Sequence, residues 1–365
     1  MLRLVNPAIR EFDILFPRAD LDSVLQLGRC LADIFSSMKN LEVLSVQVLY
    51  PAPLLDMESL PRLHPHLRRL EVGPDAYTAI DHLRPLSALP HLEHLTICLG
   101  ARGPPNLHIT LPRLRSLAVY CGFDIVGMLL AHVDAPGLQA FSLTETHRNS
   151  NDMSQELPNH LRTLVANCPS LTAFEWSSSQ DWAYRMGYRG RLNAGVPLAE
   201  LIAPLLAHHP MRRLSVWLHD PVVPLTPADF RAIAEAWPNL KSLSLYGAGG
   251  EDGEARFADL ESVMAFARHC PQLRSLDVPV VQLDPPCDEA AVAKDSEVAH
   301  GVRVRAPHWL RELVVGQVDM AGSANANGDS GEDEEQQRDR KQVGIVKLRG
   351  LMENVFPSAS IRYRY

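Results

Sequence analysis

Histidine and cysteine are the residues of this chain best suited to hold a metal ion, but their spacing argues against that chemistry. The 365 residues include 15 histidines, with close pairs at His64/His66, His91/His94 and His208/His209. No pair has a cysteine or a carboxylate at zinc-ligand spacing. The six cysteines are scattered and form no C-x-x-C pair, so neither a zinc site nor a disulfide framework is indicated. We expect solvated or capping histidines and no bound metal.

A glycine-rich run at residues 247–253 is the nearest approach to a nucleotide-binding motif. It fails the G-x-G-x-x-G pattern because Asp252 stands at the third glycine position, and two carboxylates would lie where phosphate binds. A turn that leaves a strand is the better interpretation. The G-x-S-x-G, Walker A and H-E-x-x-H motifs are missing from the sequence as well. The sequence therefore predicts neither an enzyme nor a cofactor.

Aromatic and basic side chains alternate in one segment, which contains Trp182, Tyr184, Arg185, Tyr188, Arg189 and Arg191. Such a cluster can bind single-stranded nucleic acid through base stacking and phosphate contacts. The alternatives are a return loop whose rings pack on the next structural unit, or a contact with a protein. The net charge of −8 gives no general attraction for nucleic acid or an anionic membrane, so the sequence favours the packed loop.

The elements that must position any site are marked by one phrase, Pro-x-Leu-x-x-Leu-x-Val, which recurs eleven times with apolar substitutions. Its first apolar residue falls at positions 9, 41, 67, 92, 114, 138, 171, 211, 240, 273 and 310. The L-x-L alternation is typical of a strand. An ordinary amphipathic helix is the alternative, and the proline that precedes most copies disfavours it.

Between the phrases the apolar spacing is helical, for example at Leu260, Val263, Met264 and Ala267. A fixed phrase with return paths of variable length is typical of leucine-rich repeats. The predicted fold class is α/β: a ribonuclease-inhibitor-like leucine-rich-repeat solenoid of about 11 β/α repeats, with a parallel concave sheet and outer helices.

The domain organisation follows from composition. Residues 1–318 are predicted to form the solenoid, with an inserted loop at about 284–300 that mixes proline, alanine and charges. Residues 319–342 are acidic and of low complexity, so we expect them to be disordered. Residues 343–365 restart an amphipathic pattern and are predicted to form a C-terminal capping helix and strand.

Strands stacked in register would place the residues between the inward apolar positions in parallel rows on the concave face. The central row is predicted to hold Glu11, Val43, Arg69, His94, Ser116, Ala140, Ala173, Arg213, Ser242, Ser275 and Glu312. A second row would hold Asp13, Ser45, Glu71, Thr96, Ala118, Ser142, Glu175, Ser215, Ser244 and Asp277. Past the strands come Gln47, Cys98, Tyr120, Thr144, Ser177, Trp217, Tyr246 and Pro279.

Small polar residues in these rows would let a partner approach closely, and the aromatic rings beside them would either anchor that partner or be buried under loops. We therefore predict protein contacts on the concave face at Tyr120, Glu175, Arg213, Trp217, Tyr246 and Asp277. Trp176, in contrast, occupies an inward position and is predicted to be core.

Two phrases begin with Cys-Pro: Cys168-Pro169-Ser170-Leu171 and the segment 270–278. Together with the Leu-Pro-x-Leu-x-x-Leu openings and the ending at residues 343–361, they make the chain resemble fungal, basidiomycete-type F-box/leucine-rich-repeat-like proteins. The resemblance implies a non-catalytic protein-recognition module, similar to the substrate-receptor part of an SCF-type ubiquitin ligase. Members of that family carry an F-box that docks the adaptor of a cullin–RING ligase. Here a repeat phrase follows Met1 almost at once and leaves no room for an F-box. We therefore expect either that the module is absent from this protein or that the sequence is a truncated form, in which case the missing N-terminal F-box would bind the cullin–RING ligase adaptor.

A free-standing leucine-rich-repeat scaffold with no ubiquitin-ligase link is the alternative function. Under both hypotheses the partner is a protein, with no nucleic acid and no membrane. The cysteines without a pairing pattern, the missing N-x-S/T sequon and the missing signal-peptide layout favour the cytoplasm or the nucleus.

Overall fold

The chain folds into two compact units, Met1–Gly190 and Arg191–Tyr365. The computed structural model describes residues 8–16, 34–35, 37–48, 56–73, 77–101, 103–104, 107–146, 153–178, 196–218, 223–247, 258–283, 310–320 and 334–363. The aromatic and basic segment 182–191 and the inserted loop predicted at 284–300 lie outside these described residues.

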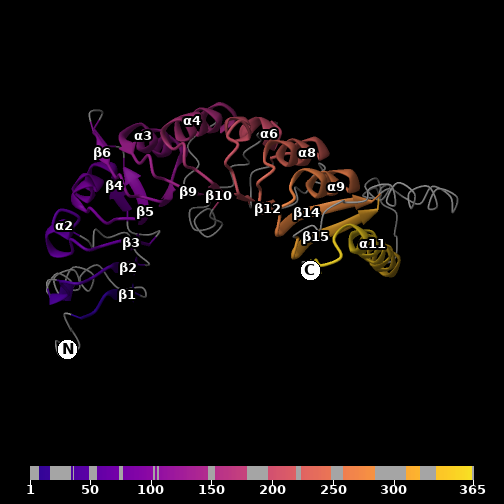
Figure 1. The fold of residues 1–365 in the computed structure, drawn as a ribbon, viewed down its shortest axis with the longest axis horizontal. Helices are drawn as coiled ribbons and strands as arrows, with labels where there is room; N and C mark the ends of the chain where they lie inside the picture. The colour runs from indigo at the N-terminus through magenta and orange to yellow at the C-terminus, as the bar shows by residue number, and fades with distance from the viewer. Residues whose placement is uncertain are drawn as a thin grey trace. The chain divides into compact units, whose positions relative to one another are not determined.

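The first unit contains a parallel sheet in which neighbouring phrases pair in chain order, β1-β2-β3-β5-β7-β9-β10, while β4 pairs with β5 and β6 with β8. Its strands are β1 (Glu11–Phe16), β2 (Val43–Val48), β3 (Arg69–Val72), β4 (Tyr77–Ala79), β5 (His94–Ala101), β6 (Ile109–Thr110), β7 (Ser116–Cys121), β8 (Val133–Asp134), β9 (Ala140–Glu145) and β10 (Ala173–Ser178). Its helices are α2 (Leu60–Leu63), the 3₁₀-helix η2 (Ile80–Ala88), α3 (Phe123–His132) and α4 (Met153–Asn167). In Figure 1, α3 and α4 lie on one side of the sheet.

The second unit repeats this design with the order β11-β12-β14-β15-β16, and β13 pairs with β14. Its strands are β11 (Arg213–Leu218), β12 (Ser242–Gly247), β13 (Ala258–Asp259), β14 (Ser275–Leu283), β15 (Glu312–Met320) and β16 (Ser360–Tyr363). Its helices are α6 (Leu198–Leu201), α7 (Ala203–Leu206), α8 (Pro227–Ala236), α9 (Leu260–His269) and α11 (Glu334–Val355). Helices α6, α8 and α9 again lie on one side of the strands (Figure 1). The predicted α/β fold of leucine-rich-repeat type is confirmed.

The apolar positions of the phrases build the core because strand alternation turns all of them toward the helices. Leu240, Leu243 and Leu245 are 0%, 0% and 1% exposed. The helical spacing predicted for residues 260–267 is also confirmed, since α9 buries Val263, Met264 and Ala267. Trp176 is fully buried, as predicted, and its ring meets Phe123 edge-on at a centroid distance of 6.1 Å.

A tight turn leads into most of the phrase strands whose preceding residues the structure describes, and the residue that opens this turn is buried. In one repeat the backbone N–H of Leu240 donates to the carbonyl of Trp237 over 3.0 Å, with Pro238 at the second turn position. The Trp237 indole N–H then donates to the carbonyl of Leu205 in the preceding repeat, over 3.1 Å. The opening residue therefore connects consecutive repeats.

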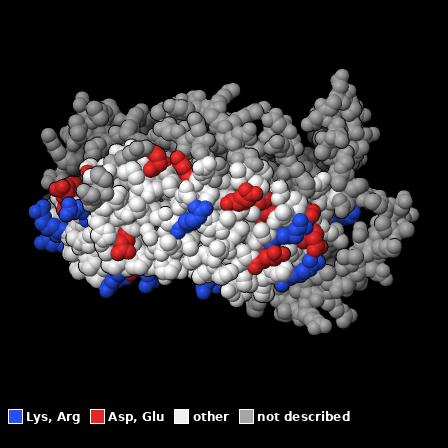
Figure 2. Space-filling model, turned by 90° about the horizontal axis from the view of Figure 1, so that it is seen from above, with Lys and Arg blue, Asp and Glu red and all other residues white. Residues whose placement is uncertain are grey.

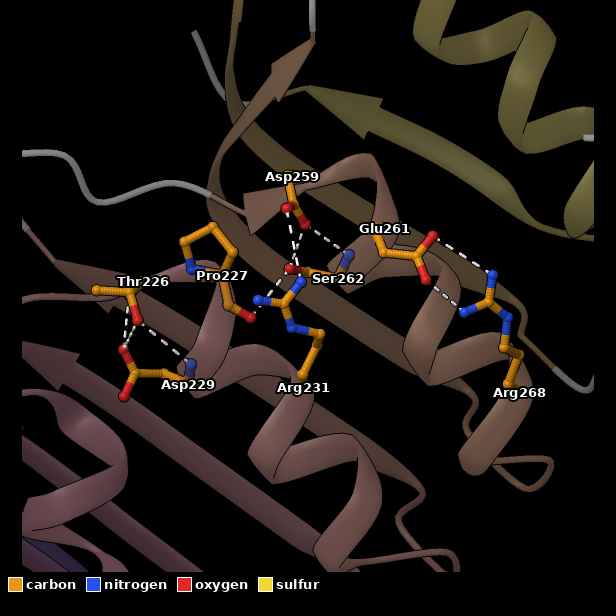
Figure 3. Close-up of polar contacts among 8 residues, drawn as sticks. All are labelled: Thr226, Pro227, Asp229, Arg231, Asp259, Glu261, Ser262 and Arg268. Atoms are coloured by element: carbon orange, nitrogen blue, oxygen red, sulfur yellow. Dashed lines mark hydrogen bonds and ion pairs between the residues drawn. The ribbon is translucent and has the colours of Figure 1, made fainter. Parts of the chain in front are cut away.

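Helix starts in the second unit are connected in a similar way (Figure 3). The hydroxyl of Thr226 accepts the backbone N–H of Asp229, and the Asp229 carboxylate accepts the N–H of Thr226, which is a capping box at the start of α8. Asp229 also accepts the backbone N–H of Ala199 in α6 over 2.8 Å. At α9, Asp259 caps Ser262, whose hydroxyl donates to the carbonyl of Pro227 over 3.1 Å. Each cap thus also joins its helix to the preceding one.

Strands β14 and β15 run longer than the phrase predicts. Pro279 was expected past the end of a strand, but it lies inside β14, where pairing resumes at Val280↔Gln317 after Val278↔Val315. A Cβ on Gly316 would lie 2.3 Å from the Pro279 carbonyl oxygen, so glycine is needed opposite the proline.

The predicted disordered segment 319–342 overlaps two regular elements. β15 continues through Met320 and α11 begins at Glu334, so residues 319–320 and 334–342 of this segment lie in a strand and a helix. Residues 321–333 lie outside the described part of the chain. The helix starts early because Glu334 to Lys341 contain strong helix formers, which low complexity alone does not reveal. Helix α11 and strand β16 occupy the region where a capping helix and strand were expected.

Candidate protein-binding face

Each unit presents one face of its sheet away from its helices, and this face is called the open face below. The predicted rows are in register on it. In the first unit the strand pairings align Glu11, Val43, Arg69, His94, Ser116, Ala140 and Ala173. In the second unit they align Arg213, Ser242, Ser275 and Glu312. The phrase therefore predicted the strand register correctly in both units.

Trp217 and Tyr246 form an aromatic pair on the open face of the second unit. They are register partners on β11 and β12, their ring centroids are 5.5 Å apart, and the ring planes are tilted by 32°. Both side chains are half-buried. A tilted pair at this separation is within the favourable range for aromatic contacts, so each ring restricts the orientation of the other.

Small polar residues form the surface beside these rings. Ser215, Ser244 and Asp277 align on adjacent strands, and the Ser244 hydroxyl donates to the Asp277 carboxylate over 3.1 Å. Asp277 is 7% exposed. Its carboxylate therefore serves as an internal acceptor and offers little surface to a partner, although the sequence had suggested a contact there. Arg213, at the start of β11, is exposed.

The predicted contact residues of the first unit, Tyr120 and Glu175, lie on β7 and β10. Tyr120 is half-buried and Glu175 is exposed. Burial raises the pKa of the Tyr120 hydroxyl above its usual value, and the carboxylates of Glu175 and Glu71 raise it further. The hydroxyl therefore stays protonated at neutral pH and remains a hydrogen-bond donor.

Cys98 departs from the predicted rows because it is fully buried rather than exposed. It lies where β5 is flanked by two strands, since Tyr77 of β4 and Tyr120 of β7 are both its register partners. The residues on either side, Ile97 and Leu99, are buried as well, so the alternation of exposed and buried residues ends at this point of β5. The phrase does not contain β4, and it therefore gave no sign of this.

Sequence reasoning also missed the buried residue that opens each turn, apart from noticing two cysteines there. The Cys270 thiol donates to the carbonyls of Ala234 and Trp237 over 3.4 Å each. Burial raises the pKa of Cys270 to about 12 and that of Cys168 to about 11. Both thiols stay protonated at neutral pH, so neither supplies a thiolate nucleophile. The position that could have revealed these buried residues in the sequence is the one immediately before each Pro-x-Leu.

Within the described ranges, no group of three or more histidine, cysteine or acidic side chains is arranged to hold a metal ion. None of the helices described has both the length and the apolar character needed to cross a bilayer. On the side that bears the helices, Figure 2 shows positive and negative side chains interspersed over a largely uncharged surface. That side presents no large patch of a single charge in the part drawn in colour or white.

No protein-family model matches this sequence, and no curated protein matches it either. Among solved structures, the chain is similar to a Bacteroides fragilis protein that was a structural-genomics target, with 16% identity over 71% of this chain and 72% of that chain and a TM-score of 0.41. It is also similar to the crystal structure of the Rad7 and Elc1 complex in yeast, with 14% identity over 81% and 76% of the chains and a TM-score of 0.37. At these identities and TM-scores, neither structure informs the function of this chain.

Proposed function

We propose that this chain is a non-catalytic module that recognises a protein through its open face. The observation that carries the proposal is the pair of Trp217 and Tyr246 on adjacent strands of the second unit, beside small polar residues. Tryptophan and tyrosine are the side chains most enriched at the energetic centres of protein interfaces. Two paired strands and a ring-to-ring contact hold these side chains in place, which lowers the entropy that binding must spend on ordering them.

A partner can approach the sheet closely at this point. Ser215 and Ser244 have short side chains, and the hydroxyl of Ser244 is held by Asp277. A partner side chain that inserts beside the rings therefore meets a level polar surface, where hydrogen bonds orient it and the rings supply the apolar contact.

The finer part of the proposal is the substrate-receptor role in an SCF-type ubiquitin ligase, with the free-standing scaffold as the alternative. The Cys-Pro phrases support it, because they resemble the cysteine-containing leucine-rich repeats of F-box proteins. The cytoplasm or nucleus is the proposed compartment, and it is supported by Cys98, Cys121, Cys168 and Cys270, which are all buried free thiols. Co-precipitation of the ligase adaptor with the protein that the longest natural transcript encodes tests this role. Failure to co-precipitate leaves the scaffold as the function.

Recognition itself is tested with two alanine variants of the full chain. A protein partner is captured with wild type and identified, and its Kd is then measured for Trp217→Ala and for Val346→Ala. Val346 is a suitable control because its side chain is apolar and 63% exposed, and because it lies on helix α11 rather than on a strand of the open face. We expect Trp217→Ala to weaken binding about 30-fold, the effect of losing an interface hot spot, and Val346→Ala to leave it unchanged.

The thermal midpoint decides how a loss of binding is interpreted. If Trp217→Ala lowers the midpoint as much as truncation of a buried residue does, the ring belongs to the core and the proposal is wrong. If Trp217→Ala binds the partner as tightly as wild type does, the proposal is also wrong.

A further inference from the structure

A row of basic side chains lies along the edge of the second unit where its strands begin. It consists of the residue that follows the first apolar position of each phrase: Arg212, Lys241, Arg274 and Arg311. This set is called the basic row below. Arg212, Arg274 and Arg311 are exposed, and Lys241 is partly exposed.

Backbone hydrogen bonds place these residues next to one another. The carbonyl of Arg212 accepts the N–H of Lys241 over 2.7 Å, that of Lys241 accepts the N–H of Arg274 over 2.8 Å, and that of Arg274 accepts the N–H of Arg311 over 2.8 Å. Neighbouring strands are about 4.8 Å apart, so the row spans roughly 14 Å. Like charges on directly adjacent strands repel one another, and the folded unit retains this cost.

The first unit shows that the same position can be neutralised within the chain. There the equivalent residues are Arg10, Glu42, Arg68, Glu93, Arg115, Gln139 and Thr172, linked by the same backbone hydrogen bonds. The charges of the first five alternate, and ion pairs join Arg10 to Glu42 over 3.2 Å and Arg68 to Glu93 over 3.9 Å. The second unit keeps the geometry of this position and lacks the alternation.

The acidic residues closest to the basic row along the described strands are already engaged. Glu312 pairs with Arg362 over 3.1 Å. Asp277 is 7% exposed and accepts a hydrogen bond from Ser244. Immediately before the row, Asn239 and Gln272 present neutral amides, and the Gln272 amide donates to that of Asn239 over 3.5 Å. The positive charge of the row is therefore directed at solvent or at a partner.

We propose that the basic row binds an acidic, extended segment of a protein partner, which lies across the strand starts of the second unit. This deepens the proposed function and rests on it, because the segment belongs to the partner that the open face recognises. An extended chain rises about 3.3 Å per residue, so four or five residues cover the row. Arginine binds carboxylates in a two-pronged arrangement, and the amides beside the row suit a peptide backbone. An acidic peptide is favoured over nucleic acid as the occupant because the row belongs to the unit whose open face is proposed to recognise a protein.

The probe for this proposal is a fluorescein-labelled octaglutamate peptide, measured by fluorescence anisotropy with the full chain. Octaglutamine and a single-stranded thymidine oligonucleotide are the comparison probes. The test variants are Lys241→Glu and Arg274→Glu, each alone and both combined. The control matched to each single variant is Arg115→Glu, which changes the charge by the same amount at the equivalent, exposed position of the first unit. Thermal midpoints of all these variants establish that the chain remains folded.

We expect wild type to bind octaglutamate and not octaglutamine, with an affinity that falls as salt is added. The double variant should lose at least about tenfold in affinity, and Arg115→Glu should stay within about twofold of wild type. A loss in Arg115→Glu equal to that in the single variants, or no loss in the double variant, overturns the proposal. Tighter binding of the oligonucleotide, lost in the same double variant, would assign the row to nucleic acid instead.

The outcome for the basic row is separable from that for the proposed function. Trp217→Ala should leave the affinity for octaglutamate unchanged, because the ring lies at the opposite end of its strand from Arg212. If octaglutamate binds as expected while Trp217→Ala retains the full affinity for the partner, the proposal for the basic row is supported and the proposed recognition through the open face is refuted. If the double variant binds octaglutamate like wild type while Trp217→Ala loses the partner, only the basic row is refuted.

Discussion

Two buried tryptophans differ in one hydrogen bond, and replacing each with phenylalanine isolates its effect. Trp176 and Trp237 are both 0% exposed. The indole N–H of Trp237 donates to the carbonyl of Leu205, whereas that of Trp176 finds no acceptor among the described residues. Trp→Phe leaves a smaller ring without the N–H at either site, so the loss of volume is closely matched.

The expected free energies follow from the local environments. Trp→Phe removes on the order of 50 Å² of buried apolar surface, which is about 1 kcal/mol at 25 cal/mol per Å², and the small cavity adds about 1 kcal/mol. At Trp237 the lost hydrogen bond adds about 1 kcal/mol, so Trp237→Phe should cost about 3 kcal/mol. At Trp176 the substitution removes an unpaired buried donor, which returns about 1–3 kcal/mol. Trp176→Phe should therefore be nearly neutral, while Trp176→Ala should cost about 3–5 kcal/mol.

Equilibrium unfolding in urea, followed by far-UV circular dichroism, measures these differences. The residues belong to different compact units, and each variant is compared with wild type measured under the same conditions. If Trp176→Phe destabilises its unit as much as Trp237→Phe does, the Trp176 N–H has an acceptor and the reasoning fails. Equal costs for Trp176→Phe and Trp176→Ala would show that the ring is not packed as described.

Other consequences of the packing can be measured in the same way. Gly127→Ala should lower the thermal midpoint, because its Cβ would lie 2.4 Å from the His160 ring, whereas Gly350→Ala in α11 has open space around it and should stabilise by about 0.5–1 kcal/mol. Burial lowers the pKa of His64 and His160 below the usual 6.5, so both are neutral when folded. The unfolded chain binds more protons below pH 6.5, and urea midpoints should fall as the pH decreases from there and stay constant above it. Asp229→Ala should cost about 2–3 kcal/mol by circular dichroism, because it removes an acceptor shared by two helices, and a loss below about 0.5 kcal/mol would contradict that role.

The strand register was predictable because the phrase carries it. Alternation of period two decides which side chains face inward, and a slip by one residue would expose Leu243 and bury Ser244. That constraint is local, so it needed no knowledge of neighbouring strands. The burial of Trp176 followed from the same alternation.

The features that escaped prediction depend on segments distant in the sequence. Cys98 is buried at the point where β4 pairs with β5, and Pro279 is accommodated because a glycine, Gly316, lies on the neighbouring strand. The Asp277 carboxylate accepts a hydrogen bond from Ser244 one strand away. Each of these is set by a neighbour whose identity the phrase leaves open, and the candidate site was therefore less predictable than the fold.

The hydrogen bonds that recur at the strand starts join backbone groups. The carbonyl of Lys241, for example, accepts two N–H groups from the next strand, those of Arg274 and Ser275, over 2.8 and 3.3 Å. These backbone bonds do not require a particular side chain, although the Thr172 hydroxyl also donates to the carbonyl of Gln139 over 3.2 Å. Arginine, glutamate, glutamine, threonine and lysine can therefore all occupy the position in this chain. Evolution or an engineer can therefore rewrite the sequence of charges along this edge one repeat at a time. The charges along this edge of a leucine-rich repeat can therefore change which partner is bound while the backbone structure stays the same.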